Sequence, residues 1–386
     1  MKNSTQSKVV TYDDWIYRLG LNLLPGIGDI SAKILVSYCG GAKEIFEASP
    51  KELEKIPGIG RKGALEVSKS NVLERAQIEF DFMQKNQIAP IFYTDPEYPK
   101  RLKFCQDAPI ILFKKGNVDL NRPRFLGIVG TRNSTNYGRG LLKEIMDKLL
   151  PFNLVMVSGL AYGIDICAHR EALNVGIPTI SVLAHGLDRI YPNLHRKEAL
   201  EMQKEGAILS EFFSGSLPDR ENFPKRNRII AGMVDALLVV EASKKGGALI
   251  TADLANGYSR EVFAVPGRLD QPFSEGCNDL IRTNKASLFK SVEDLTYLLN
   301  WELEPKKKGM QQQMIFDLPE EQQRIVDSFQ DKKIMEFDAL FHLTNFSISK
   351  LNQILLNMEI EGLLLSLPGK AYKLKNQVDS YLSVNE

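Results

Sequence analysis

The sequence predicts an α/β protein built around a doubly wound, mostly parallel β-sheet. Between residues 124 and 299, short apolar runs alternate with helical stretches, and the connecting loops are short. The runs are apolar almost throughout, as expected of parallel strands that helices cover on both faces. A sheet of this kind binds its ligands at the carboxyl ends of the strands. The expected strands are residues 125–130, 154–159, 178–184, 207–212, 236–242 and 261–267.

Composition limits the classes of function. The chain has 386 residues, 44% of them hydrophobic and 25% charged, which is the composition of a globular protein. This length predicts about two to four domains. The net charge is only +1, so a nucleic-acid partner would have to be bound by a local basic patch.

The cysteines, the histidines and the hydropathy indicate the cellular compartment and argue against a metal site and a membrane span. The four cysteines are far apart and form no CxxC pair, so we expect buried thiols in a reducing compartment. The four histidines show no HExxH spacing, and we expect no metal site. The first residues contain no apolar signal core, and no apolar run approaches the ~18 residues of a membrane span. We therefore expect a soluble cytoplasmic protein with no membrane insertion.

Residues 1–74 are expected to form a helical domain that contains a near-repeat. Residues 24–28 (LPGIG) and 56–60 (IPGIG) each combine an apolar residue, a tight glycine turn and a following helix. This pattern resembles the helix-hairpin-helix motif, in which amides at a helix N-terminus point toward a phosphate. Arg61 and Lys62 would add positive charge at the second copy. A DNA-binding role and a structural or protein-binding role both remain open for the hairpins.

Residues 75–301 are expected to form the core domain, in which residues 75–120 are a bridging segment of one helix and two strands. Residues 302–316 are polar and charged and are expected to be a linker. Residues 317–386 read as three helices and a two-stranded hairpin, which resembles a winged helix-turn-helix. One face of the third helix is expected to carry Ile348, Leu351, Leu355 and Met358.

Residues 221–228 (ENFPKRNR) place three cations at the expected start of a helix. The cations are Lys225, Arg226 and Arg228, and Asn227 lies among them. Such a cluster can hold phosphates through its charge and through free amides of the helix N-terminus. In isolation, a solvated basic turn is the simpler interpretation of these residues. Phosphate binding is favoured only if suitable residues also lie at the other strand ends.

Glycine-containing turns follow several of the other expected strands. They offer backbone amides near helix starts, and an arginine in one of them is suited to bidentate phosphate binding. None of them matches the GxGxxG or GxxxxGK[ST] fingerprint. The turns are residues 130–138 with Arg132, residues 158–165 with Gly159, and residues 241–251 with Gly246 and Gly247.

Five motifs in this order, GTRNSTNYG, SGLAYGID, FPKRNRIIAG, GGALITA and VFAVPG, resemble those of the DNA-processing protein A family. The resemblance extends over nearly the whole chain, including the segment DPEYPKRL and both terminal domains. It implies an extended Rossmann-like core in a homodimer that binds and protects single-stranded DNA. It also implies that the protein loads the RecA recombinase onto this DNA during natural transformation and homologous recombination. We expect no catalytic residue and no cofactor.

The resemblance also implies a set of DNA-contacting residues. We expect Arg132 and the three cations of residues 221–228 to act as one site that neutralises phosphates. Phe223, Tyr137 and Tyr162 are candidates for stacking with bases, with core packing as the alternative for each. The expected DNA-binding residues are Gly130, Arg132, Ser134, Ser158, Gly159, Lys225, Arg226, Asn227, Arg228, Gly246 and Gly247.

The chain departs from the family pattern at several positions. Tyr162 stands where arginine is frequent, and His195 stands where asparagine is frequent. His185 lies in a turn that usually bears glycine, and Lys244 and Lys245 precede Gly246 in place of a serine-glycine. These departures concern individual contacts with DNA. We expect both histidines to be structural or hydrogen-bonding residues.

Two other functions fit parts of the pattern. The segment KKGGALITADLA resembles the PGGxGTxxE loop of nucleoside-monophosphate phosphoribohydrolases, but the final glutamate is missing, with Ala255 two residues past Asp253. The expected general acid–base is then absent. Glu211 and Glu241, at strand ends, are expected to orient neighbouring arginines. A nucleotide-binding sensor without a DNA role is disfavoured because both phosphate-loop fingerprints are missing.

The winged helix is not expected to bind duplex DNA. Lys350, Asn352 and Gln353 lie on the exposed face of its third helix, but Glu359 and Glu361 lie close by. Carboxylates near a groove-facing helix repel the phosphate backbone. A protein-binding or regulatory role is the favoured interpretation.

Overall fold

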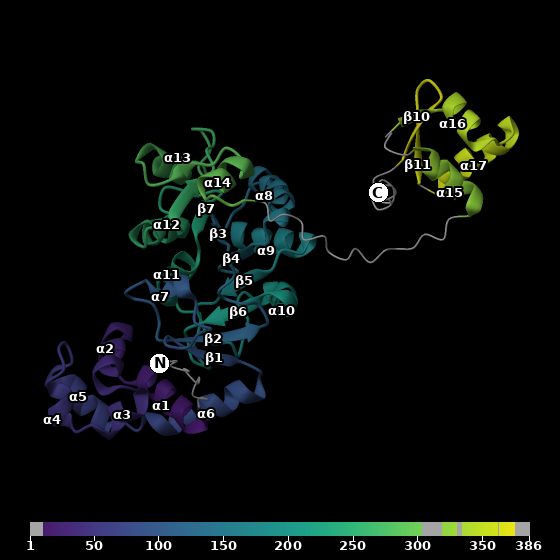
Figure 1. The fold of residues 1–386 in the computed structure, drawn as a ribbon. Helices are drawn as coiled ribbons and strands as arrows, with labels where there is room; N and C mark the ends of the chain where they lie inside the picture. Colours follow the sequence, from purple (N-terminus) through teal and green to yellow (C-terminus); the bar gives the residue numbers. More distant parts are fainter. Residues whose placement is uncertain (1–10, 303–318, 330–333, 362, 375–386) are drawn as a thin grey trace, which may run out of the picture. The chain divides into compact units, whose positions relative to one another are not determined.

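The computed structural model describes residues 11–302, 319–329, 334–361 and 363–374 (Figure 1). The chain divides into two compact units, Met1–Pro305 and Lys306–Glu386. The predicted linker, residues 302–316, falls outside the described residues apart from Glu302.

The first unit contains a nine-stranded sheet in the order β1-β2-β6-β5-β4-β3-β7-β8-β9. All six predicted strands are present and parallel to one another, and β9 continues this parallel set. Two strands of the predicted bridging segment, β1 and β2, extend the sheet in antiparallel pairing beyond β6. The strands are β1 (Ala89–Phe92), β2 (Ile111–Gly116), β3 (Phe125–Val129), β4 (Val155–Ser158), β5 (Thr179–Val182), β6 (Ala207–Ser210), β7 (Ala236–Val239), β8 (Glu261–Ala264) and β9 (Ser287–Leu288).

The strand order reverses between β3 and β7. The chain proceeds from β3 through β4 and β5 to β6 in one direction and then returns to place β7 beside β3. In a doubly wound sheet, the loops at the carboxyl ends of such neighbouring strands diverge to opposite faces and leave a crevice between them. This reversal therefore defines where a ligand is expected.

Helices cover both faces of the sheet, and the strand residues alternate between them. In β4, Val155 and Val157 pack into one apolar cluster, while Met156 packs into the other. The cluster that contains Val155 includes α7 (Lys100–Lys103), α11 (Asn222–Met233), α12 (Gly247–Gly257) and α13 (Glu275–Arg282). The cluster that contains Met156 includes α8 (Asn136–Leu149), α9 (Ile164–Val175) and α14 (Val292–Leu298). A smaller cluster beside β6 includes α10 (Arg196–Glu205).

Six helices precede the sheet and form the N-terminal helical region. Both predicted hairpin turns are present, with Gly26 at φ +74° and Gly58 at φ +81°, conformations that favour glycine. Ile111 and Phe113 of β2 share an apolar cluster with these helices, so the region packs against the β1–β2 end of the sheet (Figure 1). The helices are α1 (Tyr12–Leu23), α2 (Asp29–Cys39), α3 (Ala42–Glu47), α4 (Pro50–Glu54), α5 (Gly60–Lys69) and α6 (Val72–Lys85).

The second unit is a winged helix. The predicted hairpin is present, and a further strand pairs with it to give a three-stranded sheet in the order β10-β12-β11. Leu351, Leu355 and Met358 are buried as predicted, but the prediction for Ile348 was wrong, because this first residue of its helix lies a turn before the core contact and is 59% exposed. The elements are α15 (Glu320–Phe329), β10 (Ile334–Glu336), α16 (Phe337–Thr344), α17 (Ile348–Ile360), β11 (Leu364–Leu367) and β12 (Ala371–Leu374).

Within the described residues, no helix has both the length and the apolar character that crossing a bilayer requires.

Candidate functional site

Glu241 anchors the turn that follows β3. It lies just past the end of β7, and its backbone carbonyl accepts a hydrogen bond from the Thr131 amide at 2.7 Å. Its carboxylate accepts hydrogen bonds from the Thr135 amide at 2.9 Å and from the Thr135 hydroxyl. Thr135 also caps α8 by accepting a hydrogen bond from the Gly138 amide. Glu241 thus fixes residues 130–138 at the crevice, and it does so without the neighbouring arginine that the sequence predicted.

Arg226 lies beneath the crevice, at the ends of β4 and β5. Its side chain is buried, and Nη1 donates to the carbonyl of Gly159 at 2.6 Å and to the carbonyl of Val182. Nε donates to Oδ1 of Asn227 at 3.1 Å. Burial lowers the pKa of Arg226 to about 10, and the nearby Asp165 carboxylate opposes this shift. Arg226 therefore remains charged but serves as internal support.

The small residues at the strand ends pack closely against other residues of the protein. A Cβ on Gly159 would lie 2.5 Å from Nη1 of Arg226, and a Cβ on Gly130 would lie 2.5 Å from Ile164. The Ser158 hydroxyl is buried and donates to the carbonyl of Ile128 at 2.6 Å. Close packing within the fold explains these residues, which the sequence analysis gave as expected DNA-binding residues.

Arg132 is an exposed cation in the turn that follows β3. Its guanidinium carbon lies 5.4 Å from the ring centroid of Phe223, and that of Arg226 lies 5.9 Å from the same centroid. Phe223 lies in the first turn of α11 and is half-buried. Tyr137 is 60% exposed, and Tyr162, which meets His195 edge-on, is 45% exposed. These two tyrosines have accessible rings.

The N-terminus of α12 opens toward solvent. Gly246 is its N-cap and provides no side-chain hydrogen bond, and no atom lies within 4 Å of the place where a Cβ on Gly247 would be. Lys244 forms an ion pair with Glu275 at 3.0 Å, whereas exposed Lys245 has no carboxylate partner among the described residues. Free helix amides next to a free lysine suit an anion. The sequence offered Lys245 only as a departure from the family pattern.

Ser134 and the two histidines make local contacts. The Ser134 hydroxyl lies 3.2 Å from Nη1 of Arg139. His185 and His195 are buried, and their Nδ1 atoms bond the carbonyls of Gly186 and Leu160, each at 2.9 Å. Hydrogen-bonding roles were predicted for both histidines. The described residues contain no group of three or more side chains placed to hold a metal ion.

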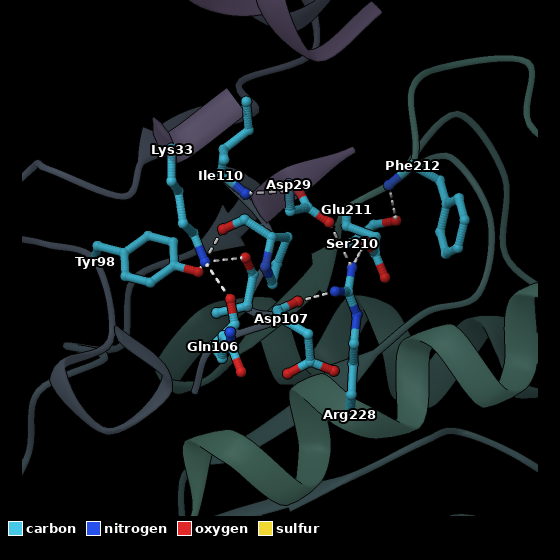
Figure 2. A network of polar contacts seen from close by, with 12 residues as sticks. Asp29, Lys33, Tyr98, Gln106, Asp107, Ile110, Ser210, Glu211, Phe212 and Arg228 are labelled. Carbon is cyan, nitrogen blue, oxygen red and sulfur yellow. Dashed lines mark hydrogen bonds and ion pairs between the residues drawn. The ribbon is translucent and has the colours of Figure 1, made fainter. Parts of the chain in front are cut away.

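Arg228 lies apart from Arg226. Residues two apart on an α-helix point in nearly opposite directions. Nη2 of Arg228 binds Asp29 at 3.1 Å and also Glu211, as the sequence predicted for Glu211 (Figure 2). Lys225 is exposed and lines a hollow of about 630 Å³ together with Arg228. Lys225 and Arg228 lie on a different side of α11 from Arg226. The four cations therefore do not converge on a single point.

Comparison with known proteins identifies relatives of this chain. A family model described as DNA recombination-mediator protein A matches residues 89–300, and one described as DprA winged helix domain matches residues 312–370. Protein Smf of Synechocystis is 38% identical over 286 residues, which are 72% of this chain and 71% of the relative. DNA processing protein DprA of Bacillus subtilis is 40% identical over 200 residues, 52% of this chain and 67% of the relative.

Two solved structures are similar at 30% sequence identity. DNA processing protein A of Streptococcus pneumoniae aligns with a TM-score of 0.62 over 77% of this chain and 100% of its own. DNA processing protein A of Helicobacter pylori, described for its single-stranded DNA binding mode, aligns with a TM-score of 0.51 over 56% of this chain and 98% of its own.

Proposed function

This chain belongs to the DNA recombination-mediator protein A family (DprA/Smf), and from this premise we propose that it binds single-stranded DNA at the carboxyl edge of its sheet. One observation carries the proposal: exposed Arg132 follows β3, and exposed Lys245 follows the neighbouring β7, next to the uncapped N-terminus of α12. The relative from Helicobacter pylori, described as binding single-stranded DNA, supports the choice of ligand.

The chemistry of binding follows from the site. Arg132, Lys225 and Lys245 neutralise phosphates, and the amide of Gly247 binds a phosphate oxygen, whereas the Gly246 amide donates to the carbonyl of Ser243 at 3.0 Å. Bases rest on the exposed rings of Tyr137 and Tyr162, and each stacked base contributes about 1–3 kcal/mol. None of these contacts reads a base edge, so binding is independent of sequence.

Other residues of the predicted DNA-binding set lie beneath this surface and support it. Arg226 with Gly159 and Asn227 holds the base of the crevice, while Gly130, Ser134 and Ser158 shape the turns around it. In this proposal, these residues set the position of the cations.

We further propose what happens to the bound strand. The protein protects it and loads RecA recombinase onto it in natural transformation and homologous recombination, in the cytoplasm and without a catalytic step or a cofactor. A homodimer would place two interfaces on one strand and raise the avidity. Membership of a family described as recombination mediators supports this part.

The test is a binding experiment with labelled oligonucleotide over a salt series, with single strand, duplex and mononucleotide as competitors. We expect the single strand to compete best, and log K to fall with log[salt] at a slope of about −2 for three phosphate contacts. Equal competition by a mononucleotide, or a slope of zero, would contradict the proposal.

A further inference from the structure

Residues 106–110 are held by the N-terminal helical region through two side chains of α2 (Figure 2). Oδ1 of Asp29 accepts a hydrogen bond from the Ile110 amide at 3.0 Å. One turn later, Nζ of Lys33 donates to the carbonyls of Gln106 at 3.2 Å and Ala108 at 2.6 Å. The helix that follows the first hairpin turn is therefore bound to the main chain that leads into β2.

The same residues are held from the opposite side by the core helices. Nη1 of Arg228, on α11, donates to the carbonyl of Asp107. The Tyr258 hydroxyl, at the end of α12, donates to both oxygens of the Asp107 carboxylate, at 2.7 and 2.8 Å. Five residues of chain are thus fixed between the N-terminal helical region and the helices α11 and α12, which bear Lys225 and Gly247.

Arg228 also joins the two sides directly. Its Nη2 binds Oδ2 of Asp29 at 3.1 Å and the carboxylate of Glu211, just past the end of β6. Burial opposes the charge of Arg228, but the carboxylates of Glu211 and Asp29 outweigh it and raise the pKa of the guanidinium. One permanently charged arginine is therefore shared by the carboxylate of Asp29, 199 residues away in sequence, and that of Glu211, 17 residues away.

The network adds specific polar contacts to the apolar cluster that α2 shares with Ile110 and Ile111. The hollow of about 630 Å³ lies beside it, between Asn22 of the N-terminal helical region and Phe212 of the core. Arg228 commits both terminal nitrogens to protein oxygens, and its Nε is buried without a partner. Both N–H groups of Nη2 are used by carboxylates of the protein itself.

We propose that Arg228 is a positioning residue that fastens the N-terminal helical region to α11 and so fixes the helical turn bearing Phe223 and Lys225. The inference rests on the proposed function, and it changes the role of the first hairpin. The start of α2, which the hairpin pattern would offer to a phosphate, instead carries Asp29 and is used within the molecule.

Asp29→Asn separates this proposal from a direct electrostatic role. The change removes a negative charge near a site for a polyanion, so simple electrostatics predicts equal or tighter binding of single-stranded DNA. Fastening predicts the reverse, because the amide keeps the shape but loses the charge that holds Arg228. We expect amide exchange in Asp29–Cys39 to be at least about tenfold faster. We expect the affinity for a labelled oligonucleotide to fall about five- to tenfold.

Arg228→Met completes the experiment in the full-length protein. We expect faster exchange in α2 and weaker DNA binding, with the slope of log K against log[salt] unchanged because no phosphate contact is lost. Arg228→Lys should restore part of the affinity, since lysine can still pair with one carboxylate. Lys204→Met, which removes an exposed cation before the amino end of β6, is the control and should change none of these quantities.

Three results would overturn the proposal. Unchanged exchange in α2 would show that the network does not fasten it. Unchanged or tighter DNA binding by Asp29→Asn would show that the fastening does not position the site. A flatter salt slope in Arg228→Met would make Arg228 a phosphate ligand. If the unmodified protein bound no DNA, the proposed function would fail by itself, and exchange in α2 would still report on the fastening.

Discussion

The guanidinium of Arg226 lies directly against the backbone of Gly159: Nη1 donates to the Gly159 carbonyl at 2.6 Å, and a Cβ at this glycine would lie 2.5 Å from the same nitrogen. Arg226 cannot move aside without losing its two carbonyl partners. Gly159→Ala should therefore lower the free energy of unfolding by about 1–3 kcal/mol.

Urea denaturation of Gly159→Ala, followed by circular dichroism, measures this cost. The matched control is Gly140→Ala on α8, where no atom lies within 4 Å of the new Cβ. Alanine is the better helix former, so the control should gain about 0.5–1 kcal/mol. Equal effects at both positions would mean that the contact between Arg226 and Gly159 does not constrain residue 159.

Removing the charge of Arg226 should make stability depend more strongly on pH. Burial raises the pKa of Asp165, and Arg226 counteracts this shift. In Arg226→Met the folded-state pKa of Asp165 rises further. A carboxyl with a raised folded-state pKa destabilises the fold as the pH rises from its unfolded value of about 3.9 through its folded value.

The stability difference between Arg226→Met and the unmodified protein should therefore be larger at pH 7 than near pH 4. Unfolding curves at the two pH values measure it. Arg226→Lys keeps the positive charge and should keep the pH dependence of the unmodified protein, although it loses one carbonyl contact. A stability difference that is the same at both pH values would exclude Asp165 as the group that senses Arg226.

The sheet could be predicted from the sequence because its strands are uninterrupted apolar runs. The four residues of β4, Val155–Ser158, are all buried, and the same is true of β5, β6 and β7. The two residues of β9 are exposed and carry no such signal. The antiparallel pairing of β2 with β6 depends on tertiary contacts that no local pattern encodes.

The site was predicted less completely, and Arg226 and Arg228 explain why. Arg226 lies three residues before buried Ile229 and four before buried Ile230, so helical periodicity already assigns it to the core-facing side of α11. That signal was available in the sequence. The partner of Arg228, Asp29, lies about 200 residues away, and nothing local indicates the pair.

Glu241→Gln should loosen the turn that carries Arg132. The carboxylate accepts hydrogen bonds from both the amide and the hydroxyl of Thr135, and an amide group can accept with only one of its two atoms. We expect a loss of about 1–3 kcal/mol in the free energy of unfolding. We also expect faster amide exchange in residues 130–138. Exchange that stays unchanged there would contradict the anchoring role.

Removing the residues after Pro305 should leave single-stranded DNA binding intact. The exposed residues of α17 include Leu356 and Ile360, and its Lys350 forms an ion pair with Glu321. This composition suits a protein partner better than a phosphate backbone. Affinity and salt slope of the truncated and full-length proteins should agree in the oligonucleotide assay. A flatter slope after truncation would place phosphate contacts in the winged helix.

Lys225→Met should remove one phosphate contact without disturbing the fold. Lys225 is exposed at the rim of the hollow and has no carboxylate within ion-pair distance among the described residues, so its loss leaves no buried charge behind. Each phosphate contact with a single strand contributes about 0.7 to the slope of log K against log[salt], so the slope should flatten by about 0.7. Lys204→Met, at the opposite edge of the sheet, removes the same charge and should leave the slope as it was. Identical slopes for the two variants would mean that Lys225 does not contact the strand and that net charge alone sets the affinity.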